Sequence, residues 1–272
     1  MRFPERERVI YAKNPLETVI CQLRFPPILR IEAETPFQFQ EKIRAEYPIV
    51  KERNLGTAGI PFPPEILKVF GEEMSWLKTG KQAYEFHSDD EAWTVTLTKE
   101  YIALTSKRYT RWEEFKERLL IVVSALEEVY KPAQYTRIGL RYRDIVNRSK
   151  FNLKGVDWSE LLQPHIAGEL NSDIGQYVNT VKKELLVQLD NGNGSVRIVH
   201  GLVQQPDTDE PCYLIDSDFS TTEKMEVNSA GERLNYFNAE AARLFKWCIT
   251  PKLHQSMEPG PVPPRKPRNQ LA

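Results

Sequence analysis

The residues with the clearest potential for chemistry are three arginines that alternate along one short segment. Arg137, Arg141 and Arg143 occupy odd positions, and mostly apolar side chains occupy the even ones. Because alternate residues of a strand face the same side, the three guanidinium groups share one face and could clamp a phosphate or a carboxylate. Gly139 lies between them and would let a ligand approach the backbone closely. The alternative is an ion-paired outer face of a sheet that binds no ligand, with the many glutamates of the helix expected at 113–128 as partners.

Two aspartates form the most enzyme-like pair. Asp216 and Asp218 are two residues apart in a strand-like segment, so their carboxylates would share a face. They could hold one hard cation, with Asp190 or Glu223 as a third ligand. This pattern predicts a metal-dependent enzyme acting on phosphoester or nucleotide substrates, in which the arginines hold the phosphate. The alternative is a pair of solvated carboxylates at a strand end, with no catalytic residue and no metal site.

Established catalytic motifs are missing from the sequence. The four histidines are far apart, and none occurs in a His-x-x-x-His or His-Glu-x-x-His arrangement. There is no Gly-x-Ser-x-Gly sequence, and no glycine-rich segment carries the Lys-Ser/Thr of a phosphate-binding loop. We therefore expect no cofactor.

Aromatic residues gather in the first half of the chain. They are Trp76, Tyr84, Trp93, Tyr101, Tyr109 and Trp112. Such rings stack on the bases of single-stranded nucleic acids when basic residues lie beside them. Several neighbouring residues are acidic instead, so a packed core is the favoured interpretation.

The strands that must position these side chains are predicted as a meander over 74–106, a strand at 135–146, a hairpin within 181–200 and a strand at 212–220. A long irregular connection rich in proline is predicted at 49–72. Strands that follow one another in hairpins pair antiparallel, so the sheets should be mainly antiparallel.

Two long helices complete the expected fold. The first should start at a capping box formed by Thr110 and Glu113, because apolar residues then recur three and four positions apart. The last helix should begin near 235–238. Meanders with packed helices indicate the α+β class.

The order of helix, meander and long helix occurs twice along the chain. We therefore expect two similar halves, an N-terminal α+β half at 1–147 and a C-terminal α+β half at 148–257. Residues 258–272 contain five prolines and three basic side chains. This composition predicts a disordered Pro-rich basic tail.

Composition and charge exclude several classes of protein. The 272 residues carry 37 basic and 38 acidic side chains, and a net charge of −1 argues against binding nucleic acid through the whole surface. The three cysteines include no Cys-x-x-Cys pair, and the N-terminus has no apolar signal region. No apolar run approaches the roughly 20 residues of a membrane span. We expect a cytoplasmic protein with reduced thiols and no membrane partner.

Four strings of residues, in their order and spacing, resemble a known family. They are 14–16 (Asn-Pro-Leu), 22–29 (Gln-Leu-Arg-Phe-Pro-Pro-Ile-Leu), 137–144 (Arg-Ile-Gly-Leu-Arg-Tyr-Arg-Asp) and 238–247 (Asn-x-Glu-Ala-Ala-Arg-Leu-Phe-x-Trp). Together they resemble a sporadically distributed family of uncharacterised bacterial proteins of about this length. The resemblance covers nearly the whole chain except the tail. It implies a cytoplasmic accessory protein with no agreed activity, and patchy distribution of this kind is typical of defence systems, including antiviral ones.

Taken together, these observations favour a non-catalytic interaction protein. It would serve as a subunit, adaptor or sensor of a bacterial accessory system, with a protein partner encoded nearby, and a homo-oligomer stays open. The metal-dependent enzyme is the first alternative. A nucleic-acid-binding module that uses the arginine face and the tail is the second.

Overall fold

The computed structural model describes residues 3–5, 7–54, 82–205 and 210–262. Its strands are β1 (Ile10–Tyr11), β2 (Leu16–Arg24), β3 (Ile49–Asn54), β4 (Gln82–His87), β5 (Trp93–Leu97), β6 (Tyr101–Ser106), β7 (Arg137–Val146), β8 (Lys182–Gln188), β9 (Ser195–Gln204), β10 (Pro211–Thr221) and β11 (Pro259–Gly260). Its α-helices are α1 (Arg30–Ala33), α2 (Phe37–Ile43), α4 (Trp112–Tyr130), α5 (Trp158–Leu161), α6 (Pro164–Ala167), α7 (Ala230–Cys248) and α8 (Pro251–Ser256). The predicted α+β class is confirmed.

Nine of these strands form one antiparallel sheet in the order β3-β4-β5-β6-β2-β7-β10-β9-β8. The two sides of the central β2–β7 pair have the same arrangement. Strand β2 lies beside β6, the last strand of the meander that follows it, and β7 lies beside β10, the last strand of the next meander. Each meander then leads into a long helix. The predicted halves at 1–147 and 148–257 therefore share one sheet, and their origin by duplication stays a prediction.

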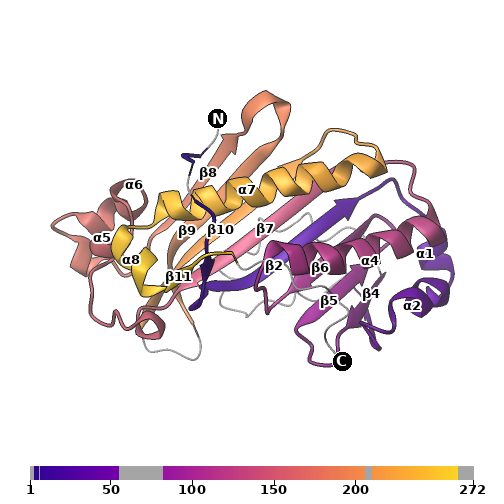
Figure 1. Cartoon of the computed structure of the whole chain (residues 1–272), viewed down its shortest axis with the longest axis horizontal. Coiled ribbons are helices and arrows are strands. Elements are labelled where there is room, and N and C mark those ends of the chain that lie inside the picture. The colour runs from indigo at the N-terminus through magenta and orange to yellow at the C-terminus, as the bar shows by residue number, and fades with distance from the viewer. Residues whose placement is uncertain (1–2, 6, 55–81, 206–209, 263–272) are drawn as a thin grey trace.

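Both long helices, α4 and α7, pack on the same side of this sheet (Figure 1). We call that side the helix face and the opposite side the far face. On β7 the even-numbered residues Ile138, Leu140 and Tyr142 join the main core under the helices. The odd-numbered residues therefore point to the far face, where Ile145 belongs to a separate small apolar cluster.

The capping box predicted for the first long helix is wrong in detail. Arg111 precedes the helix in an extended conformation and makes no capping bond with its side chain. The Thr110 hydroxyl donates to Glu114, and the Glu113 carboxylate accepts hydrogen bonds from Arg8 at 2.6 and 3.0 Å. Arg8 from the N-terminal segment thus engages the Glu113 carboxylate that the capping box would have used.

The second long helix begins at Ala230, five or more residues before the predicted start. Gly231 in its first turn weakens the local preference for helix, which explains why the sequence signal begins late. Burial of Leu234 and Phe237 against the sheet compensates for this weakness. The helix is therefore stabilised mainly by tertiary packing at its start.

The predicted irregular connection at 49–72 starts too early. Residues 49–54 form the edge strand β3, which pairs with β4, although four consecutive polar residues at 51–54 give no alternating signal in the sequence. The rest of that connection lies outside the described residues. The start of the predicted meander at 74–81, which includes Trp76, lies outside them as well.

The predicted tail also starts too early at residue 258. Ile10 and Tyr11 of β1 pair with Gly260 and Pro259 of β11. The backbone N–H groups of residues 12 and 13 donate hydrogen bonds to the backbone oxygens of residues 258 and 257. Residues 258–260 are thus part of the fold, and 263–272 lie outside the described residues.

All three cysteines are buried free thiols. Among the residues that the structure describes, no helix combines the length and the hydropathy that a membrane span requires.

Candidate functional site

The arginines and aspartates singled out in the sequence meet on the far face of the sheet. Strands β7 and β10 are direct neighbours, with Asp216 opposite Arg143 and Asp218 opposite Arg141. The actual ion pairs run diagonally. Arg141 donates from Nε and Nη2 to Asp216 at 2.7 and 2.5 Å, and Arg137 donates from Nη2 to Asp218 at 2.8 Å. The two predicted sites are therefore one network.

Burial makes the centre of this network costly to disturb. Arg141, Arg143 and Asp216 are 8%, 2% and 5% exposed, and Arg143 lies 3.5 Å from Asp216 and 3.2 Å from Glu17. Burial alone would lower the pKa of Arg141, but the Asp216 carboxylate outweighs it and the pKa rises. For Arg143, burial outweighs Asp216 and Glu17, so its pKa falls. A single carboxylate thus stabilises two buried guanidinium groups.

This pairing changes the interpretation of both candidate sites. The carboxylates of Asp216 and Asp218 lie inside β10 rather than at its end, and they accept hydrogen bonds from arginines. Within the described ranges, no group of three or more His, Cys, Asp or Glu side chains is placed to hold a metal ion. The geometry favours the ion-paired alternative over a phosphate clamp or a metal centre.

The predicted aromatic cluster is divided between core and cavity. Tyr84, Trp93, Tyr101 and Trp112 are buried residues with 2–5% exposure. Tyr109 differs, because it lines a cavity on the helix face. That cavity was not predicted from the sequence.

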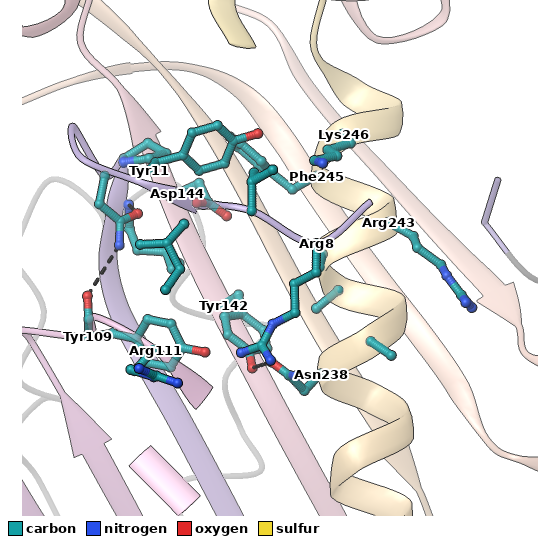
Figure 2. Close-up of a pocket in the computed structure, with 18 of the residues that line it drawn as sticks. Arg8, Tyr11, Tyr109, Arg111, Tyr142, Asp144, Asn238, Arg243, Phe245 and Lys246 are labelled. Carbon is teal, nitrogen blue, oxygen red and sulfur yellow. Dashed lines mark hydrogen bonds between the residues drawn. The ribbon is translucent and has the colours of Figure 1, made fainter. Parts of the chain in front are cut away.

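The cavity has a volume of about 360 Å³ and lies between the N-terminal segment 7–16, the segment 109–111 before α4, strand β7 and helix α7 (Figure 2). Its volume is within the range of about 300–1,000 Å³ typical of small-molecule sites. Residues 7–16 cross it as a strap, and pairing of β1 with β11 holds that strap. We call this space the strap cavity.

The sequence explains why the strap cavity exists. Strand alternation turns Tyr142 and Asp144 toward the helix face. Opposite them, α7 presents Ala241 and Ala242, whose small side chains leave space that larger residues would fill. Phe245, one turn further along α7, closes one side.

Hydrogen bonds hold the walls of the strap cavity in place. The Tyr142 hydroxyl donates to Oδ1 of Asn238 at 2.9 Å, which ties β7 to α7. The Asn14 amide donates to the backbone oxygen of Tyr109 at 3.2 Å, which ties the strap to the segment before α4. The wall is therefore built before any ligand arrives.

Asp144 is the one carboxylate in the floor of the strap cavity. It is 5% exposed, and no described residue donates a hydrogen bond to its carboxylate. Burial raises the pKa of Asp144 well above its ordinary value, and the Asp216 carboxylate on the far face raises it further. A buried polar group without a partner is rare in proteins, so the setting of Asp144 calls for an explanation.

The charges around the mouth of the cavity are largely balanced. Arg8 and Arg111 both pair with Glu113, at 2.6 and 3.0 Å. Arg243 pairs with the fully buried Glu240. Glu113 has a pKa lowered to about 2, first by its hydrogen bond from Arg8. The mouth therefore presents ion pairs rather than a strong field of one sign.

The strap cavity draws on three of the four strings that carry the family resemblance. Residues 14–16 lie in the strap, Tyr142 and Asp144 belong to the string at 137–144, and α7 contributes part of the string at 238–247. One feature of the sequence could have indicated the site. Ile138, Leu140 and Tyr142 face the core, and Asp144 occupies the next position on that same face although it is acidic.

Comparison of the sequence with models of known protein families gave no match, and a search of curated proteins found no similar protein.

Proposed function

We propose that the protein is a non-catalytic interaction protein that serves as a subunit, adaptor or sensor. The observation that carries this proposal is the mutual pairing of Arg137 and Arg141 with Asp218 and Asp216. The side chains best suited to phosphate or metal chemistry neutralise one another inside the sheet. Their role is to specify the pairing of β7 with β10, as buried ion pairs can do.

The setting in a bacterial accessory system, with antiviral defence as one case, rests on the resemblance described above. The partner would be a protein encoded nearby. Nucleic-acid binding through the arginine face has less support, because phosphate contacts would have to compete with the ion pairs that Arg137 and Arg141 already make.

The test separates a binding protein from a metal-dependent phosphoesterase. The full chain, tagged at its native locus, is purified and analysed by size-exclusion chromatography and mass spectrometry. The purified protein is also incubated with bis(p-nitrophenyl) phosphate and Mg²⁺ or Mn²⁺. We expect co-elution with one partner in fixed stoichiometry and no turnover above the protein-free blank.

A monomer without a partner that hydrolyses the substrate would overturn the proposal, provided that Asp216→Asn abolishes the metal-dependent rate. Asp157→Asn, at a surface site preceding α5, is the matched control for that variant. It changes the same functional group without touching the arginine network.

A further inference from the structure

The strap cavity combines features that together select one kind of ligand. A cavity that is partly open to solvent ends at a buried carboxylate that no described residue neutralises by a hydrogen bond. The carboxylate of Asp216 is near enough to act on Asp144, but it is a like charge and makes the site still less favourable for an unpaired anion. A group that brings hydrogen-bond donors and a positive charge would remove this deficit.

The walls around Asp144 suit an organic cation. Tyr109 and Tyr142 meet edge to face with ring centroids 5.8 Å apart, and Tyr11 and Phe245 do so at 5.9 Å. All four rings line the cavity (Figure 2). The faces of aromatic rings attract cations, most strongly where water is excluded.

The rest of the lining suits an apolar body. Ile10 and Leu16 of the strap and Ala241 of α7 offer alkyl surface to the space. A hard metal ion is a poor match, because Ca²⁺ requires six to eight oxygen ligands and Mg²⁺ an octahedral set. An anion is a poor match as well, because Arg8, Arg111 and Arg243 pair with Glu113 and Glu240, and Lys246 donates to the backbone oxygen of Glu7.

We propose that the strap cavity is a binding site for a small organic cation, an alkyl or arylalkyl ammonium, whose charged group pairs with the Asp144 carboxylate. The ammonium donates hydrogen bonds to Asp144 among the aromatic rings, and the hydrocarbon part packs under the strap. This site goes beyond the proposed function and does not depend on it.

Isothermal titration calorimetry on the full chain tests the proposal with probes of matched shape. The cations are 2-phenylethylammonium and n-hexylammonium, and the controls are 2-phenylethanol and 3-phenylpropionate. We expect saturable binding of at least one cation, about tenfold or more tighter than either control. Absence of saturable binding of both cations up to about 10 mM, or equal binding of the controls, would overturn the proposal.

Two variants assign the binding to this cavity. Asp144→Asn keeps the shape but removes the charge, and it should weaken cation binding about tenfold or more. Asp157→Asn, which removes an exposed carboxylate outside the lining of the cavity, should leave the affinity within about twofold. Unchanged affinity in Asp144→Asn would overturn the site.

Ala241→Leu keeps the test decisive if Asp144→Asn does not fold. The larger side chain should occupy the cavity while the aromatic walls and Asp144 remain, so cation binding should be lost. Circular dichroism and a cooperative melting transition establish that the variant is folded. Cation binding that survives in this folded variant would place the ligand elsewhere and would overturn the proposal.

Discussion

The two faces of the β7–β10 pair treat buried carboxylates in opposite ways. On the far face, Asp216 lies between Arg141 and Arg143, and every charge has a partner. On the helix face, Asp144 is equally buried, yet no described residue donates a hydrogen bond to it. The difference separates a carboxylate that stabilises the fold from one that costs stability and is available to a ligand.

The largest effect is expected from Asp216→Asn. This change removes the carboxylate that pairs with the buried Arg141, leaves Glu17 as the counter-charge of Arg143, and should reduce the free energy of unfolding by about 3–5 kcal/mol. Urea denaturation monitored by circular dichroism measures it. Asp157→Asn should cost far less, and a loss under about 1 kcal/mol in Asp216→Asn would show that water reaches the network.

A second effect concerns His200, which lies on the helix face opposite Ile215 and is 1% exposed. Burial lowers the pKa of His200 from 6.5 to about 4. The folded state therefore favours the neutral ring. The stability that folding gains from the neutral His200 is complete above pH 6.5 and is lost as the pH falls toward 4. The loss should reach roughly 3 kcal/mol.

His200→Gln should flatten the dependence of unfolding free energy on pH between 6.5 and 4. The measurement is a series of urea titrations on both proteins across that window. Because Nδ1 of His200 lies 2.8 Å from the Tyr213 hydroxyl, the variant also loses a hydrogen bond at every pH. The slope rather than the absolute stability is decisive, and equal slopes would contradict the prediction.

A third effect has the opposite sign, because Asp144→Asn should stabilise the free protein. Because the pKa of Asp144 is raised in the folded state, the protonated side chain contributes its full stability below the ordinary pKa of an aspartate. That stability is lost as the pH rises and the side chain must ionise. The gain should therefore vanish near pH 4 and grow to the order of 1 kcal/mol or more at pH 8. Thermal melts at both pH values measure it, and destabilisation at pH 8 would reveal a partner for Asp144.

The smallest effect is expected at the mouth of the strap cavity. Glu113→Gln breaks pairs with Arg8 and Arg111, but Arg8 and Glu113 are 40% and 32% exposed. Solvent screening limits such pairs to about 1 kcal/mol or less, in spite of the low pKa of Glu113. A loss above about 2 kcal/mol in urea denaturation would mean that the strap is as tightly fixed as the sheet centre.

The sequence predicted one face of this comparison better than the other. Alternation along β7 placed Arg137, Arg141 and Arg143 together correctly, because that signal is local. It could not show that Asp216 would neutralise them, since β7 and β10 are separated by some 65 residues and their register depends on the whole sheet. The alternative of an ion-paired face was available, but it assigned the pairing to glutamates at 113–128, whereas the partners in the structure are Asp216 and Asp218.

The strap cavity could not be assembled from sequence, because its walls come from four distant segments. Asp144 and Tyr109 were each visible, as the end of a strand and as one aromatic among several. What no local pattern shows is that α7 presents small residues opposite them. The helix start at Ala230 was missed for a related reason, since packing against the sheet rather than intrinsic preference extends it there.

The pairing of β1 with β11 joins a segment near the start of the chain to the segment that follows α8. The same few residues that anchor the strap also hold the turn after α8, through Ile10, Tyr11 and the Lys13–Glu258 ion pair at 2.8 Å. A displacement of residues 259–260 would therefore act directly on the strap that covers the cavity. A partner bound at residues 257–260 and a molecule bound at Asp144 would each change the affinity of the protein for the other through the backbone hydrogen bonds of this strand pair.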